Sequence, residues 1–133
     1  MKQKYIILVV DDEPTNVFLL FKIIECQDYK VLTAGSGVEA LEIMGQIKPD
    51  LVLLDLMMPR ISGFEVLDQM KNNHSTKSIP VIIITAMDDS KNKEQAIHAG
   101  ASAYLTKPIT KKIVLDTVSH ILNNKNTNHV SKF

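Results

Sequence analysis

The sequence predicts an α/β fold in which one parallel sheet carries helices on both faces. Five short apolar runs alternate along the chain with five longer segments whose apolar residues recur at helical spacing. Strict alternation of this kind is typical of βα units with parallel strands. The runs are also almost continuously apolar, as strands are when helices cover both faces of the sheet.

Each predicted strand is rich in Ile, Val or Leu, or is bounded by residues that end a strand. The third run, Leu51–Asp55, is the most apolar, so we expect it near the centre of the sheet. The five predicted strands cover residues 5–10, 30–34, 51–55, 80–85 and 101–105.

The predicted helices have recognisable starts and ends. Pro14 suits the first turn of the first helix, where a missing N–H costs nothing. Ser36 and Thr110 are expected to cap the second and the last helix, and Gly100 to end the fourth. That fourth helix, expected over 88–99, is weakly apolar, with Ile97 its only large aliphatic residue, so we expect it to shift at low cost. The expected apolar stripes are Val17, Leu20, Phe21 and Ile24; Val38, Leu41 and Met44; Phe64, Leu67 and Met70; and Ile113, Val114, Thr117, Val118, Ile121 and Leu122.

Length and composition indicate one domain. The 133 residues, 45% of them hydrophobic, are enough for a single core. We place the domain at residues 1–123 and expect the polar, Asn-rich segment 124–133 to fray. The start, Met1-Lys2, favours a true N-terminus.

Charge, cysteine content and hydropathy restrict the class of function. Acidic and basic residues balance at 15 each, so nothing points to direct nucleic-acid binding. Cys26 is the only cysteine, which suits a reducing compartment. No apolar run is long enough for a signal sequence or a membrane helix, so the predicted location is the cytoplasm, away from membranes.

Polar residues that suit phosphoryl chemistry stand at the ends of four of the five runs. Asp11 and Asp12 follow the first run and Asp55 ends the third. Thr85 ends the fourth run, and Lys107 follows the fifth. Because ligand sites in open parallel sheets lie outside the carboxyl ends of the strands, we expect these side chains to gather at one edge.

The three acids predict a site for a hard divalent cation. Carboxylates packed together repel one another, and a bound cation relieves that repulsion. Oxygen ligands favour Mg²⁺ or Ca²⁺ over zinc, and Mg²⁺ usually takes one or two carboxylates while accepting phosphate oxygens. His74, His98, His120 and His129 are scattered without metal-ligand spacing. Mg²⁺ is therefore the predicted cofactor.

A carboxylate can also act as a nucleophile and form an aspartyl-phosphate. Asp55 is the best candidate because it ends the most central strand. Lys107 would pair with the phosphoryl oxygens as a compact cation, and Thr85 would donate its hydroxyl to another. Catalysis would then be mostly positioning and charge stabilisation.

Each of these residues, taken alone, also has an ordinary structural explanation. The Asp pair could cap the helix that follows, and Asp55 could be a loop acid. Thr85 could be a helix cap, and Lys107 a solvated lysine. Their joint occurrence, each at a strand end, favours the phosphoryl site.

Taken together, the motifs resemble the receiver domain of two-component response regulators, from about Lys4 to Leu122. The matching pieces are ILVVDDE at 7–13, LLDLMMP at 53–59, Gly63, IIITA at 82–86, GA at 100–101 and YLTKP at 104–108.

The resemblance implies that Asp55 accepts a phosphoryl group from a sensor histidine kinase or a histidine phosphotransfer protein. Asp12, Asp55 and the backbone carbonyl of Met57 would ligate Mg²⁺, Asp11 would hold metal-bound water, and Lys107 would contact the phosphoryl group. Such a domain assists only its own phosphorylation and dephosphorylation, so we expect a signalling domain and not an enzyme.

The resemblance also implies a flavodoxin-like fold, a three-layer (βα)₅ sandwich with strand order 2-1-3-4-5. Thr85 and Tyr104 would form a switch pair: the hydroxyl moves onto a phosphoryl oxygen and the ring turns inward. The bond between Lys107 and Pro108 would be cis. The face of the fourth helix, fifth strand and fifth helix would bind a downstream effector protein, an output domain or a second copy of the chain.

Two features depart from the usual family motifs. Ser62 stands where such domains often carry an acid, and only a loop effect is expected. Met57 and Met87 stand two residues after the predicted phosphoacceptor and the predicted switch threonine, where the family tunes hydrolysis. Because Met sulfur is a weak acceptor and orients an attacking water poorly, we expect the phosphoryl group to last minutes or more.

Three rival functions are alternatives to an active receiver. A flavin-binding flavodoxin-like protein needs a Ser/Thr/Gly-rich loop where this chain has DDE at 11–13. A phosphatase or phosphotransferase with an Asp nucleophile usually carries Asp-x-Asp, whereas Leu56 and Met57 follow Asp55. A degenerate receiver that only binds proteins is the third alternative. No DNA-binding, cyclase or kinase segment follows Leu122, so we expect the output in a separate partner or beyond Phe133.

Overall fold

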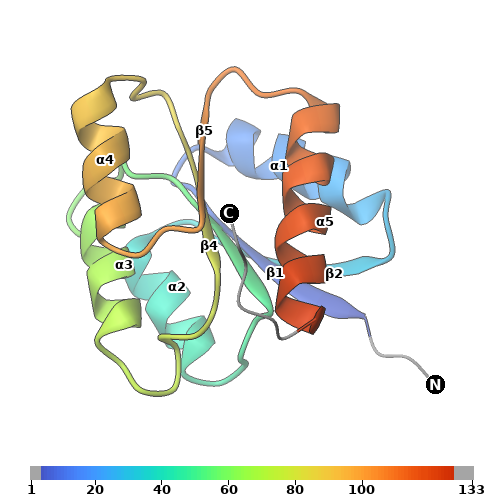
Figure 1. Ribbon diagram of the computed structural model, residues 1–133, viewed down its shortest axis with the longest axis horizontal. Coiled ribbons are helices and arrows are strands. Elements are labelled where there is room, and N and C mark those ends of the chain that lie inside the picture. Colours follow the sequence, from blue (N-terminus) through green and yellow to red (C-terminus); the bar gives the residue numbers. More distant parts are fainter. Residues whose placement is uncertain (1–3, 128–133) are drawn as a thin grey trace.

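The computed structural model describes residues 4–127, with side chains described up to Asn124. It is a three-layer α/β sandwich whose five parallel strands run in the order β2-β1-β3-β4-β5 (Figure 1). This confirms the predicted fold class and strand order. The strands are β1 (Tyr5–Val10), β2 (Tyr29–Ala34), β3 (Leu51–Leu54), β4 (Val81–Thr85) and β5 (Ala103–Thr106). The helices are α1 (Pro14–Glu25), α2 (Gly37–Met44), α3 (Gly63–Lys71), α4 (Ser90–His98) and α5 (Lys111–Thr127).

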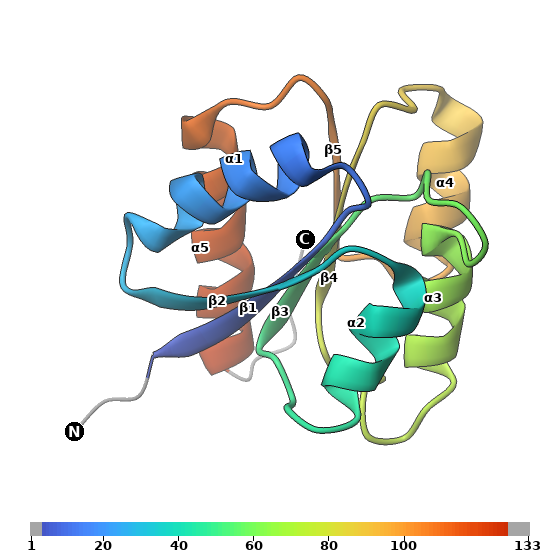
Figure 2. The same cartoon turned by 180° about the vertical axis from the view of Figure 1, so that it is seen from behind.

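Helices α1 and α5 cover one face of the sheet, and α2, α3 and α4 cover the other (Figures 1 and 2). Successive strand residues point to opposite faces. In β1, Ile7 and Val9 pack with α1 and α5, whereas Leu8 and Val10 pack on the opposite side. Both faces are therefore apolar, which explains the continuous apolar runs of the sequence.

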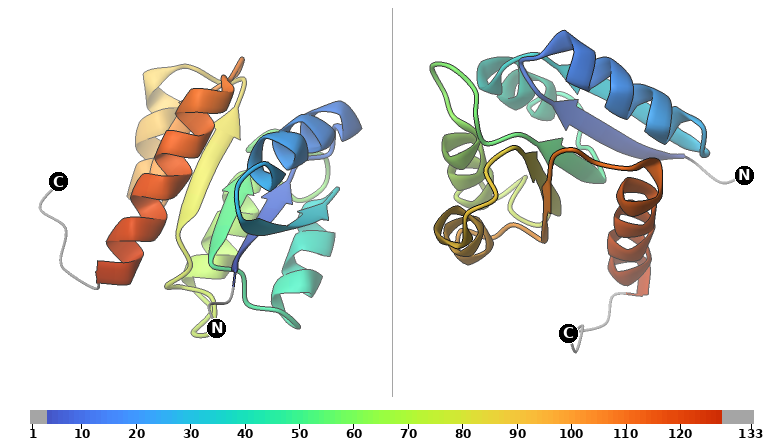
Figure 3. Two further views of the ribbon diagram at one scale, coloured as in Figure 1. Left: turned by 90° about the vertical axis from the view of Figure 1, so that its right-hand side faces the viewer. Right: turned by 90° about the horizontal axis from the view of Figure 1, so that it is seen from above.

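Strand β3 lies at the centre of the sheet between β1 and β4, as its composition predicted. Because all strands are parallel, their carboxyl ends meet at one edge of the molecule (Figure 3). Strands β2 and β5 form the two outer edges. No helix in the described part of the chain is long and apolar enough to cross a membrane.

The end of α4 confirms the predicted role of Gly100, whereas the start of β5 differs from the sequence prediction. Gly100 has a φ of +114°, and the amide of Gly100 donates to the carbonyl of Ile97 while the amide of Ala101 donates to Ala96. This pair of bonds is a Schellman motif. Because it uses the amide of Ala101, strand β5 begins at Ala103 and not at the predicted residue 101.

The core contact of α4 is small. Ile97 is 43% exposed, and Ala96 is the helix's only buried residue. Asp89 caps the helix by accepting from the amide of Asn92 at 3.1 Å, so Asp88 and Asp89 lie before the helix. The prediction that α4 has little apolar surface in the core is confirmed.

The last helix is longer than the predicted domain boundary. Helix α5 continues to Thr127, so residues 124–127 of the expected frayed tail are helical. Thr110 Oγ1 accepts from the amide of Ile113, which confirms the predicted cap. The stripe of α5 buries Val114, Val118 and Leu122, while Ile113 is exposed. The rest of the predicted tail lies outside the described residues.

Arg60 has a left-handed backbone conformation, with a φ of +67°. This region is unfavourable for residues with a Cβ atom, and Asn tolerates it better than most. We expect Arg60→Asn to raise the free energy of unfolding by about 0.5 kcal/mol. Urea unfolding will measure the change, and Arg60→Lys, which keeps the strain, serves as the control. A lower unfolding midpoint for Arg60→Asn would contradict the prediction.

Candidate functional site

Three carboxylates meet at the carboxyl edge of the sheet. Asp11 and Asp12 follow β1, and Asp55 follows the neighbouring strand β3. One oxygen from each acid lies within 4.8 Å of the other two. Asp11 is 1% exposed and Asp55 is 6% exposed, whereas Asp12 is open to solvent. The structure therefore brings the three predicted acids together.

Lys107 follows β5 and reaches across the end of β4 to two of the acids. Its Nζ donates to Asp11 Oδ2 and to Asp55 Oδ2, both at 2.9 Å. Burial alone would lower the pKa of Lys107, but these two hydrogen bonds and the two negative charges raise its pKa above the ordinary value of 10.5. Lys107 therefore forms ion pairs with the two acids and is not a solvated lysine.

Backbone amides hold the second oxygens of the two buried acids. Asp11 Oδ1 accepts from the amide of Glu13, and Asp55 Oδ1 accepts from the amide of Met57, each at 3.0 Å. Helix α1 has Glu13 at its N-cap position, with no side-chain capping bond. The ordinary explanation of the Asp pair as a helix cap is therefore wrong.

Thr85 and Tyr104 lie on the neighbouring strands β4 and β5. Thr85 is fully buried, and its Oγ1 is the one buried side-chain polar atom of the described residues that has no hydrogen-bond partner. Leaving such an atom unpaired costs free energy. The atom therefore marks a place where a bound ligand could supply the missing hydrogen bond. Tyr104 is half-buried and donates its hydroxyl to the carbonyl of Met87 at 2.6 Å. Burial and the acids Asp89, Asp88 and Asp55 raise the pKa of Tyr104.

Gly63 begins α3 directly behind the acceptor candidate. Its amide donates to the carbonyl of Leu56 at 3.0 Å, and a Cβ atom placed on it would lie 2.2 Å from the backbone oxygen of Asp55. Ser62 caps the same helix in a reciprocal capping box with Glu65. This Ser-x-x-Glu signal can be read from the sequence, and it fixes the end of the loop after β3.

The donor set fits Mg²⁺. All three candidate side-chain ligands are carboxylates, and Lys107 balances only one of their negative charges. The remaining charge matches a divalent cation, and oxygen ligands suit a hard one. Asp12, which is open to solvent and accepts no hydrogen bond from the described residues, is the acid best placed to take a new ligand.

The peptide bond between Lys107 and Pro108 is cis, as the resemblance implied. Of the four histidines, His74, His98 and His120 are exposed, and His129 lies outside the described residues. Cys26 is exposed at the end of α1.

The family model described as the response regulator receiver domain matches residues 7–119. The chain belongs to this receiver family. PilH of Pseudomonas aeruginosa is 38% identical over 116 residues, which cover 87% of this receiver and 96% of PilH. DivK of Brucella ovis is 33% identical over 116 residues, which cover 87% of this receiver and 94% of DivK.

Other relatives contain the receiver as one part of a longer chain. PleD of Caulobacter vibrioides is 45% identical over 103 residues, which cover 77% of this receiver but 23% of PleD. Among solved structures, a receiver domain protein from Methanospirillum hungatei has the same fold, with a TM-score of 0.89 at 24% identity over 96% of this chain and 100% of that one. The receiver domain of a Francisella response regulator gives a TM-score of 0.85 at 26% identity, covering 92% and 99% of the two chains.

Proposed function

We propose that this receiver is a phosphoacceptor in a two-component phosphorelay and that Asp55 is the acceptor. The observation that carries the proposal is the bridge of Lys107 Nζ between Asp11 and Asp55, 2.9 Å from each, in a site where Asp55 is 6% exposed. A charged lysine beside a buried carboxylate is the arrangement that phosphoryl transfer to that carboxylate needs.

In the proposed reaction an oxygen of Asp55 attacks the phosphorus of a phosphohistidine. A P–O bond forms, the P–N bond breaks, and the imidazole of the sensor kinase or histidine phosphotransfer protein keeps the electron pair. Lys107 then transfers its hydrogen bonds from the carboxylates to phosphoryl oxygens. Asp12, Asp55 and the carbonyl of Met57 would hold Mg²⁺, with Asp11 acting through water. The bound cation supplies positive charge at the phosphoryl oxygens.

The unpartnered hydroxyl of Thr85 supports a switch at the same site. A phosphoryl oxygen on Asp55 would give this hydroxyl its missing acceptor. Tyr104 would then leave the carbonyl of Met87 and turn inward, which changes the face of α4, β5 and α5. That face would control a downstream effector or an output domain, or pair with a second copy, in the cytoplasm.

Intact mass after incubation with acetyl phosphate and MgCl₂ tests the proposal. We expect wild type to gain one phosphoryl group and the isosteric variant Asp55→Asn to gain none. No gain by wild type, either from acetyl phosphate or from a phosphorylated histidine donor, would favour a degenerate receiver that only binds proteins.

The phosphoryl group is expected to last minutes or more. The side chain of Met57 is 57% exposed at the site, and Met87 packs partly against the core, so neither presents a good acceptor to an attacking water. Intact mass recorded at intervals after removal of acetyl phosphate will give the lifetime. Met57→Asn, which adds an amide that can orient water, should shorten it. Loss of the wild-type phosphoryl group within seconds would contradict the prediction.

Phosphorylation is expected to change the hydrogen exchange of α4. Only Ala96 of this helix is buried, so few core contacts oppose a shift. Moving a two-state switch from 1:99 to 99:1 needs about 5.5 kcal/mol of differential stabilisation. The amides of α4 should exchange at a different rate with and without acetyl phosphate in wild type but not in Asp55→Asn. Equal protection of α4 in both states of wild type would count against the switch.

A further inference from the structure

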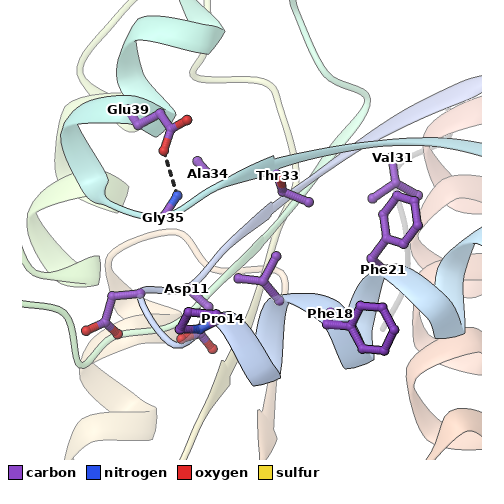
Figure 4. A pocket seen from close by; sticks show the side chains of 11 residues that line it. Asp11, Pro14, Phe18, Phe21, Val31, Thr33, Ala34, Gly35 and Glu39 are labelled. Atoms are coloured by element: carbon purple, nitrogen blue, oxygen red, sulfur yellow. Dashed lines mark hydrogen bonds between the residues drawn. The ribbon is translucent and has the colours of Figure 1, made fainter.

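A groove of about 470 Å³ runs between α1 and the edge strand β2 and ends at the acidic site (Figure 4). Its apolar wall is made by Val17, Phe18 and Phe21 of α1 and by Val31 of β2. Its size is within the range of ordinary ligand sites. The phosphoacceptor chemistry described above uses only the acids at its end.

The aromatic side chains of this groove are not core residues. Phe18 is 65% exposed, the largest exposed fraction of any large hydrophobic side chain in the described part of the chain. Phe21 was expected in the buried stripe of α1, but it is only half-buried and lines the groove with Phe18. In Figure 4 both rings project from α1. An exposed apolar surface of this kind, rimmed by polar groups, marks an interaction site.

The charged residues that line the groove are all acidic: Asp11, Asp12 and Glu39. Lys107 already binds Asp11, and Glu39 Oε1 accepts from the amide of Gly35 at 2.8 Å. Asp12 accepts no hydrogen bond from the described residues, so its negative charge is available to an incoming group. The charge complement of the groove is therefore a cation, which also binds favourably over an aromatic ring.

The position of the groove beside an outer strand favours a peptide over a compact ligand. Val31 and Thr33 lie on β2, which is an outer strand of the sheet and, among the described residues, has no strand on its far side. An extended segment can lie along such an edge and place alternate side chains in the adjacent groove.

We propose that the groove between α1 and β2 binds an extended segment of a partner protein that carries a lysine or arginine beside apolar side chains. The lysine or arginine side chain of the segment lies at Asp12, and its apolar side chains lie on Phe18 and Phe21. Because Asp12 is also a ligand of the proposed Mg²⁺ site, the partner segment and Mg²⁺ oppose each other's binding. This coupling rests on the proposed function, and linkage makes it equal in both directions.

Amide NMR of the labelled receiver, titrated with the peptide Ac-Leu-Arg-Leu-Leu-amide, tests the proposal. We expect shifts at Phe18, Thr33 and Gly35, and weaker or no binding of the matched peptide with Glu in place of Arg. Saturating MgCl₂ should weaken the binding of the basic peptide. Phe18→Ala should lower the affinity for the basic peptide about tenfold, as the loss of a central aromatic contact does. Leu19→Ala is the matched control, because Leu19 is a 46% exposed neighbour that lines a different pocket.

Asp12→Asn separates the contribution of charge to peptide binding from that of shape, because it removes the charge of the side chain and keeps its size. This variant should bind the basic peptide more weakly and should lose the effect of MgCl₂ on peptide binding. Equal binding of the two peptides, or full affinity in Phe18→Ala, would overturn the proposal. The mass measurement on Asp55 uses no peptide, so failure of the groove and failure of the phosphoacceptor function are distinguishable.

Discussion

Gly63→Ala is expected to lower the free energy of unfolding by about 3 kcal/mol or more. The added Cβ atom would meet the backbone oxygen of Asp55 at 2.2 Å and the Cα atom of Leu56 at 2.6 Å. Both are backbone atoms of the segment that leaves the central strand, so no side-chain rotation relieves the clash. Either α3 or the backbone that carries Asp55 has to move.

Urea unfolding will measure the effect, with Gly45→Ala as the matched control. The nearest atom to a Cβ on Gly45 is a carbonyl oxygen at 3.4 Å, and this residue has a φ of −73°, which alanine adopts readily. We expect the control to be unchanged or slightly more stable. If Gly63→Ala unfolds at the same urea concentration as wild type, the close approach of α3 to the backbone of Asp55 is not present in solution.

Lys107→Met is expected to lower the free energy of unfolding by about 3 kcal/mol near neutral pH. The change leaves Asp11 and Asp55 buried side by side without their cation, at 1% and 6% exposure. Adding MgCl₂ should restore part of the lost stability, because a divalent cation replaces the ammonium charge. Phosphorylation by acetyl phosphate should slow about 100-fold, as after removal of one preorganised charge donor.

The stabilisation of the folded protein by Lys107 depends on pH. The pKa of Lys107 is raised in the folded protein, so its stabilising contribution is complete below the ordinary value of 10.5 and is lost as the pH rises through the folded value. The difference between wild type and Lys107→Met should therefore shrink in strongly alkaline solution. Lys112→Met is the control: its partner Asp116 and Lys112 itself are exposed, so no change is expected. Equal stability of wild type and Lys107→Met at neutral pH would contradict the prediction.

The positions of the site residues were predictable because their signals are local. Apolar runs that end in Asp11, Asp55 and Thr85 need only strand periodicity and the rule that parallel strands end together. The partners of Lys107 were not predictable in this way. Its position after β5 shows the edge on which it lies, but the choice of Asp11 and Asp55 depends on how the sheet twists and on which acid is already held by an amide.

Two misplaced apolar residues show the limit of helical periodicity. Ile97 is the only large aliphatic residue of α4, yet Ala96 makes the core contact, because a stripe with one large residue does not define a face. Phe21 has the right spacing for the core of α1, but β2 is the last strand on that side in the described part of the chain, so the sheet does not extend far enough to cover the ring. Periodicity predicts which residues share a face and not how far the opposing surface extends.

The contact between Lys107 and Asp11 joins residues 96 positions apart in the chain. A growing chain that has left the ribosome only as far as β4 contains all three acids but not the lysine that holds two of them. In such a chain Asp11 and Asp55 lack this counter-charge until β5 and Lys107 have been added. The same bond thus makes the charge balance of the acidic site a property of the finished domain.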